Sequence, residues 1–144
     1  MTASKYNSEG YYDPTTYEAL SRIEREERAA AKAAAFRPIV YICSPYSQGC
    51  INTNIENARK YSRFAVDRHY LPITPHIYFT QFMDDTVSEE HETALFMNFV
   101  LMSKCAELWV FGDTISAGMK AEIERAERKH MKIRYFTEEL EEKE

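Results

Sequence analysis

One glutamate stands where an α/β protein binds its ligands. The apolar run Leu108 to Phe111 leads into a turn rich in Gly, Ser and Thr, and Glu122 follows in the first turn of an expected helix. In open parallel sheets, ligands bind at the carboxyl ends of strands, beside helix N-termini that favour anions. Helical spacing puts Glu122 on the same inward stripe as Met119 and Ile123. Two roles remain open for Glu122: it acts on a ligand, or it complements the helix dipole and contributes up to about 1 kcal/mol.

Other reactive side chains are weaker candidates. His76 follows a proline and fits a structural role better than a pocket role, and Cys43 fits a small core residue at a strand end. The other histidines have no metal-ligand spacing with the cysteines, so no metal site is expected. Gly112-Asp113-Thr114 lacks the Gly-Lys-Ser/Thr ending of a phosphate-binding P-loop.

Hydrophobic periodicity predicts alternating strands and helices. Residues 1–14 are polar, and residues 75–87 read as a long aromatic loop that could wall or cover a site. Thr86 and Glu89 have the spacing of a capping box for the helix that follows. The expected elements are helix 15–36, strand 39–43, a helix from Asn52 or Asn54 to about His69, strand 71–74, helix 88–104, strand 108–111, helix 118–130 and strand 131–136.

This order is typical of an α/β fold with an open, mainly parallel sheet. We expect one flavodoxin- or Rossmann-like domain of four or five strands flanked by helices. The expected organisation is an N-terminal polar lead and helical arm over 1–36, the α/β domain over 37–137, and an acidic tail over 138–144 that frays.

Composition excludes several classes of protein. The 144 residues are 44% hydrophobic, enough for one core, and the net charge of -5 argues against a nucleic-acid binder. No apolar run approaches the roughly 20 residues that span a bilayer, so no membrane partner is expected. Three cysteines cannot all pair, which favours reduced thiols and a cytoplasmic location.

The expected helix 88–104 suggests self-association. It is apolar on most faces, from Ala94 through Met102. A helix with this pattern is buried on two sides, so we expect it to contact both the core and a second subunit. The sequence therefore predicts a homodimer or a higher homo-oligomer.

Several segments resemble a known family. They are Val40-Tyr-Ile-Cys-Ser-Pro-Tyr46, the aromatic loop, Cys105-Ala-Glu-Leu-Trp-Val-Phe-Gly112 and Ser116-Ala-Gly-Met-Lys-Ala-Glu-Ile123. In this order they resemble the nucleoside 2-deoxyribosyltransferase-like superfamily, in particular its small bacterial and phage members, over roughly residues 38–136. The resemblance implies an enzyme that breaks the N-glycosidic bond of a nucleoside or nucleotide, by transfer or hydrolysis, without a cofactor.

The same resemblance assigns roles to individual residues. Glu122, four residues after Gly118, matches the family's nucleophile, and Ser116 matches a serine near the sugar or its 5′-phosphate. Tyr41 matches a residue that positions the glutamate. The turn after the first strand lines the sugar pocket in the family, which implies the residues Ser44, Pro45 and Tyr46.

One position departs from the family. Asn98 stands where relatives often have an aspartate that handles protons, and an amide cannot accept a proton at neutral pH. Asp84 or Asp85 could substitute as the acid. The expected substrate-binding set also contains Tyr78, Gln81, Asp84 and Asp113, with Tyr46, Phe79 and Phe82 as further aromatic walls. The alternative is a nucleotide-binding sensor or sequestering protein that lacks turnover.

Overall fold

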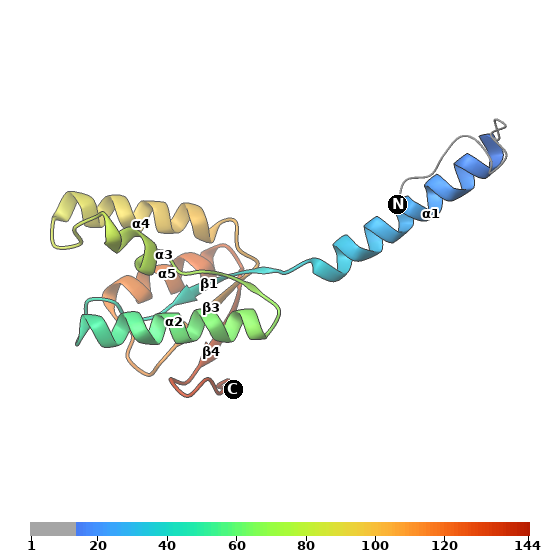
Figure 1. Cartoon of the computed structure of the whole chain (residues 1–144). Coiled ribbons are helices and arrows are strands. Elements are labelled where there is room, and N and C mark those ends of the chain that lie inside the picture. The colour runs from blue at the N-terminus through green and yellow to red at the C-terminus, as the bar shows by residue number, and fades with distance from the viewer. Residues whose placement is uncertain (1–13) are drawn as a thin grey trace. The chain divides into compact units, whose positions relative to one another are not determined.

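The computed structural model describes residues 14–144 (Figure 1). The chain divides into two compact units, one ending at Phe36 and one from Arg37 to Glu144. The first unit contains helix α1 (Pro14–Ala35), whose alanine-, glutamate- and arginine-rich sequence favours the helical state. Within residues 14–144, every helix is too short or too polar to cross a membrane.

The second unit is an α/β domain, as the sequence predicts. Its sheet has four strands, β1 (Ile39–Cys43), β2 (Leu71–Ile73), β3 (Glu107–Phe111) and β4 (Lys132–Phe136), in the order β2-β1-β3-β4. All three strand pairs are parallel, with Tyr41 opposite both Ile73 and Leu108. The central strands β1 and β3 are buried on both faces, which explains their unbroken apolar sequence.

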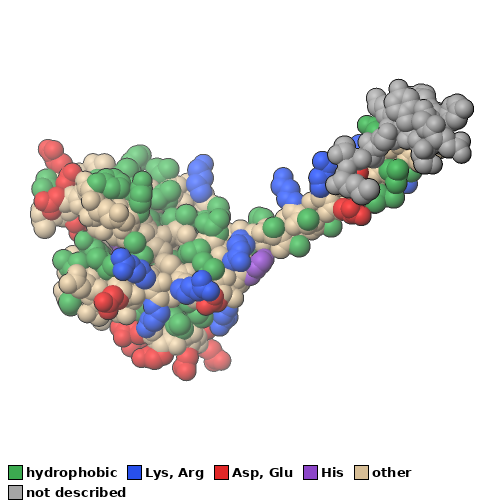
Figure 2. Space-filling model, in the orientation of Figure 1, with side chains coloured by type: hydrophobic (Ala, Val, Ile, Leu, Met, Phe, Trp, Pro, Cys, Tyr) green, Lys and Arg blue, Asp and Glu red, His purple; other side chains and the backbone are tan. Residues whose placement is uncertain are grey.

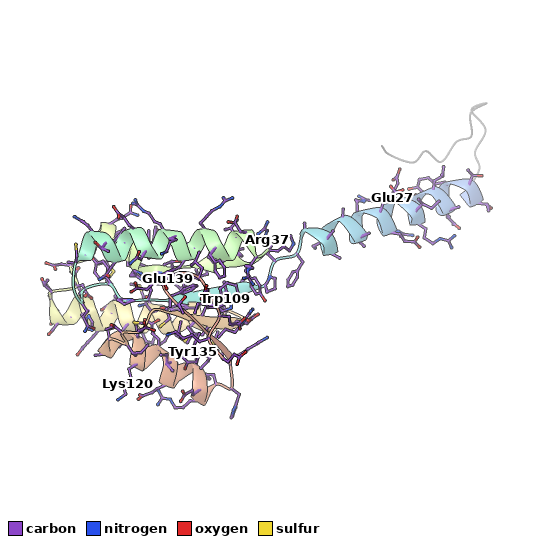
Figure 3. All side chains as sticks on the ribbon, turned by 90° about the horizontal axis from the view of Figure 1, so that it is seen from below. Glu27, Arg37, Trp109, Lys120, Tyr135 and Glu139 are labelled. Carbon is purple, nitrogen blue, oxygen red and sulfur yellow. The ribbon has the colours of Figure 1, made fainter. Side chains whose placement is uncertain are left out.

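The helices cover both faces of this sheet. Helix α2 (Ile51–Asp67) packs on one face, whereas α4 (Ser88–Met102) and α5 (Ala117–Arg128) pack on the other. Figure 3 shows α2 and α5 on opposite sides of the strands. Successive side chains of β1 point to opposite faces of the sheet, so Ile42 packs on the α2 side, whereas Tyr41 and Cys43 pack on the side of α4 and α5.

Aromatic rings fill the layer between α2 and the sheet. Tyr61 stacks on Phe111 with ring centroids 4.1 Å apart, and Trp109 lies 5.0 Å from Phe136. Phe64 contacts the same group edge-on. This rigid layer fixes β1 and β3, the two strands whose ends carry the candidate site.

The segment expected to be a long aromatic loop is instead mostly helical. It contains α3 (Pro75–Tyr78) and a 3₁₀ turn, η1 (Phe79–Gln81). Pro75 occupies the first helical position, where its fixed φ angle suits a helix and its missing N–H is not needed. Because one turn is too short to produce a periodic pattern, hydrophobic periodicity did not reveal it.

The predicted capping box at Thr86 and Glu89 is also wrong. Helix α4 begins at Ser88, and its N-cap residue Val87 makes no side-chain capping bond. The Thr86 hydroxyl instead donates to Asp84 Oδ1 over 2.6 Å, and the Thr86 backbone N–H donates to the same oxygen. Aspartate side chains bond local backbone groups in this way, and the turn removes Thr86 from the helix.

Helix α4 is less enclosed than the sequence predicts. Met102 is its one fully buried residue, whereas Phe96 and Val100 are 67% and 47% exposed. Figure 2 shows hydrophobic side chains on this part of the surface. Homo-oligomerisation through α4 stays a prediction.

The acidic tail does not fray as expected. Glu142 accepts two hydrogen bonds from the Arg134 guanidinium, at 2.8 and 2.7 Å. Lys143 Nζ donates to the Gly112 carbonyl, and Leu140 packs against the aromatic core. Figure 1 shows the C-terminus beside β4. A charged tail is thus held by specific partners that composition alone does not reveal.

Candidate functional site

A cavity of about 320 Å³ lies at the carboxyl end of the sheet. Its wall includes the residues that follow three adjacent strands: Ser44 after β1, His76 after β2, and Ser116 after β3. From β1 the chain proceeds to β2 on one side, and the remaining strands lie on the other side. The cavity therefore occupies the topological switch point, where open α/β sheets bind ligands.

The start of α5 brings Glu122 to this cavity. Ser116 is the N-cap residue, and its hydroxyl accepts the backbone N–H of Met119 over 3.2 Å. Met119 is buried in the core, which fixes the rotation of the helix. Gly118 lines the cavity, and a Cβ added there would meet open space. Helical spacing then aims Glu122 at the cavity, as the sequence predicts.

The Glu122 carboxyl is a perturbed acid. Burial raises its pKa to about 8, and hydrogen bonds with Tyr41 and Cys43 oppose the rise. At neutral pH most molecules therefore carry the protonated form, and the carboxylate dominates above pH 8. A developing positive charge beside this group would favour the ionised form at lower pH. Strongly perturbed acids in cavities are candidates for catalysis.

Two donors beneath the cavity hold the Glu122 carboxyl. Burial raises the pKa of the Tyr41 hydroxyl well above its ordinary value, and the Glu122 charge raises it further. The Cys43 thiol is affected by the same two causes. Both groups therefore stay protonated and can donate. Tyr41 does not line the cavity, but contacts Glu122 from the core, and its positioning role stays a prediction.

Removing one of these donors should raise the Glu122 pKa. In Tyr41→Phe the ring still fills the core, but the carboxylate loses one hydrogen bond. We expect the pKa of Glu122 to rise by about one pH unit. ¹³C NMR titration of glutamate side chains measures this without any assay of activity. Cys43→Ala, which also removes a donor, should move the pKa in the same direction, and a fall in either variant contradicts this geometry.

His76 belongs to the cavity wall, although the sequence favoured a structural role. Its Nε2 lies 3.3 Å from Ser44 Oγ, and its ring centroid lies 5.9 Å from that of Tyr46. Burial lowers the His76 pKa to about 4, so the ring is neutral near pH 7. The available signal was its position just after β2, at the same edge of the sheet as Ser44.

Asn98 presents an unused acceptor in the cavity wall. Its side-chain Oδ1 is buried and has no hydrogen-bond partner among residues 14–144. Leaving a buried polar atom unpaired costs about 1–3 kcal/mol. Such an atom at a cavity wall fits a ligand that brings a hydrogen-bond donor, such as a hydroxyl or an amino group.

Asp85 and His91 add a polar pair that sequence reasoning recognised only in part. Both line the cavity, and His91 Nδ1 lies 2.7 Å from Asp85 Oδ1. Asp84 was the expected binding residue, but its side chain is bonded to Thr86 and does not line the cavity. No spacing rule signals a pair formed between a turn and the first turn of the next helix.

The remaining expected residues divide into two groups. Ser44, Tyr46, Asn98, Ser116, Gly118 and Glu122 line one cavity, together with the unexpected Ser47 and Gln48. Four expected binding residues, namely Pro45, Tyr78, Gln81 and Asp113, do not line it.

Three of those residues have other contacts or lie exposed, whereas Pro45 is half-buried. Tyr78 is 62% exposed and packs against Phe79 and Phe82, which also lie outside the cavity wall. Gln81 donates to the Ile77 carbonyl, and Asp113 accepts from Lys143 Nζ over 2.8 Å. Tyr46 is thus the aromatic residue available for stacking at this cavity.

Within residues 14–144, no three His, Cys, Asp or Glu side chains are grouped to hold a metal.

Comparison with known proteins agrees with the extent of the α/β domain. A search of curated proteins found no match to the chain. A family model described as "Domain of unknown function (DUF7768)" matches residues 38–136, from the start of β1 to the end of β4. The chain therefore belongs to the DUF7768 family.

Proposed function

We propose that this protein breaks the N-glycosidic bond of a nucleoside or nucleotide, with Glu122 as the nucleophile. The observation that carries the proposal is a buried carboxyl group at the wall of a switch-point cavity, held from below by Tyr41 and Cys43. The likeness of Gly118 and Glu122 to the nucleoside 2-deoxyribosyltransferase-like superfamily supports the same role.

The chemistry follows from the properties of a glycosidic carbon. When the bond to the base breaks, positive charge develops on the sugar carbon and its ring oxygen. A nearby carboxylate stabilises this charge and can trap the carbon as a covalent intermediate, as in retaining sugar hydrolysis. Water or a second base then attacks the same carbon, which gives hydrolysis or transfer.

The other cavity residues support this substrate class. A volume of about 320 Å³ falls within the range of small-molecule sites. Tyr46 offers a ring for stacking on a base, and the unpaired Asn98 Oδ1 offers an acceptor for a sugar hydroxyl or an exocyclic amino group. The N-terminus of α5 suits a 5′-phosphate, so nucleosides and their monophosphates are both candidates.

Base release tests the proposal directly. The purified chain is incubated with ribo- and 2′-deoxynucleosides and their 5′-monophosphates, with and without a second, isotopically labelled base. Chromatography follows the free base, and we expect release from at least one class. Incorporation of the labelled base identifies transfer, whereas its absence identifies hydrolysis. No release from any compound contradicts the proposed reaction.

A non-catalytic nucleotide-binding protein is the alternative, and two observations favour it. Glu122 is mostly protonated at neutral pH, and the Asn98 amide, where the resemblance would place an aspartate, cannot accept a proton. A ligand that binds the native state alone raises the melting temperature by mass action. Stabilisation by a nucleotide without base release would therefore favour this alternative.

A further inference from the structure

A neutral nucleobase is a poor leaving group unless it gains a proton as its bond breaks. Glu122 faces the sugar in the proposed reaction, so a second group must supply this proton. Apart from hydroxyls and amides, the side chains of the cavity wall offer few groups that could act as an acid. His76 is neutral near pH 7 because burial lowers its pKa to about 4, and the Asn98 amide is not an acid. Asp85 and His91 remain.

The contact between Asp85 and His91 defines the chemistry of the imidazole. Nδ1 lies 2.7 Å from Asp85 Oδ1, so the Nδ1–H donates to the carboxylate and orients the ring. In residues 14–144, Nε2 of His91 has no hydrogen-bond partner and is open to a ligand. The side chains are 52% exposed for His91 and 32% for Asp85, so the imidazole is accessible to a substrate and to water.

The two residues come from a well-defined part of the chain. Asp85 precedes α4, and His91 lies in the first turn of that helix, which also carries Asn98. Glu122 reaches the same cavity from α5. Nucleophile and proton donor thus belong to different elements, and a substrate in the cavity can contact both.

On the basis of the N-glycosidic function proposed above, we propose that His91, oriented by Asp85, is the acid that protonates the departing base. The bond between the sugar carbon and the base nitrogen breaks, and its electron pair stays with the base. The base takes the proton from Nε2 of His91, which starts protonated on both ring nitrogens, while an oxygen of the ionised Glu122 carboxylate forms a bond to the sugar carbon. Water then attacks that carbon, the electron pair returns to Glu122, and neutral His91 takes a proton from the water. The sum is nucleoside plus water giving sugar plus base.

Leaving-group dependence tests this role. An N7-methylated purine nucleoside already carries a cationic base, which departs without a proton, whereas the unmethylated nucleoside needs one. We expect His91→Gln to slow release from the unmethylated nucleoside by about 10²-fold or more, and from the methylated one by less than about fivefold. Asp85→Asn, which disturbs the orientation of the ring, should give the same pattern with a smaller loss.

Two controls separate the role of His91 from other effects. Glu122→Gln should slow both nucleosides to the same degree, because the nucleophile acts on either. His130→Gln changes an exposed histidine just beyond α5 and should change neither rate. Circular dichroism and melting curves check that each variant is folded.

The outcomes distinguish this proposal from the function on which it rests. If wild-type protein releases base but His91→Gln slows both nucleosides equally, or neither, the acid role of His91 is overturned while the reaction stands. If wild-type protein releases no base even from the methylated nucleoside, the N-glycosidic function fails, and the role of His91 fails with it.

Discussion

Replacing Glu122 with glutamine is expected to slow base release by at least about 10³-fold. Glutamine keeps the size of the side chain and an acceptor for Tyr41, but it carries no negative charge to stabilise the sugar cation. Initial rates should be compared at pH 9, where wild-type Glu122 is ionised because its pKa is about 8. Glu124→Gln, on an exposed face of the same helix, is the matched control and should leave the rate unchanged.

The same substitution, Glu122→Gln, should raise the free energy of unfolding at alkaline pH. An ordinary glutamate releases its proton near pH 4.5, whereas folded Glu122 keeps its proton up to about pH 8. The folded wild type therefore loses stability as pH rises from 4.5 to 8, because only the unfolded chain ionises freely. Glutamine has no proton to lose, so Glu122→Gln should exceed the wild type by about 5 kcal/mol in unfolding free energy at pH 9.

Urea unfolding at pH 5 and pH 9 measures this effect. The gap between Glu122→Gln and wild type should be small at pH 5 and large at pH 9, while Glu124→Gln should show no such growth. Loss of activity together with a gain in stability would identify a group that is kept for function at a cost to folding. If the difference in unfolding free energy between Glu122→Gln and wild type is the same at pH 5 and pH 9, the Glu122 carboxyl is not a buried acid with a raised pKa.

Trp109→Ala should give the largest loss of stability. Trp109 is 1% exposed, its ring lies 4.6 Å from Tyr70 and 5.0 Å from Phe136, and its Nε1–H donates to buried Glu107. Truncating a buried aromatic residue leaves a cavity and costs about 3–5 kcal/mol. Here the Glu107 carboxylate also loses a donor, so the upper part of this range is expected.

Unfolding should be followed by circular dichroism, because the variant lacks the one tryptophan of the chain. Phe96→Ala is the control, since this ring is 67% exposed and its removal should cost less than about 1 kcal/mol. A similar loss in both variants would contradict the assignment of Trp109 to the aromatic core.

Local hydrophobic pattern and residue spacing predicted the parallel sheet and the part of the site that runs from Ser116 to Glu122. The apolar runs of β1 and β3 could form only strands buried on both faces, and the strand–helix alternation required a parallel sheet. The interval from Ser116 to Glu122 is short enough for one helix to dictate its geometry. A capping serine and a buried Met119 then orient the carboxyl group without help from distant residues.

Expectations that depended on pairing between polar side chains were less successful. Thr86 bonds Asp84 rather than capping α4, and Arg134 binds Glu142 and holds a tail expected to be loose. Polar residues have several partners of similar energy, so the choice among them depends on which backbone segments meet. The turn at 75–81 was missed for a related reason, since its helical segments are too short for periodicity to detect.

The amino-acid sequence by itself determined the α/β class, the parallel sheet and the approach of Glu122 to the carboxyl edge of that sheet, because each depends on short-range spacing and hydrophobic pattern. Only the tertiary structure decided which side chains face that glutamate. His76, Asp85 and His91 reach the cavity from segments 30 to 50 residues away in the sequence. Their convergence depends on how α3 packs against α2 and how α4 packs against α5, and no local pattern encodes that packing.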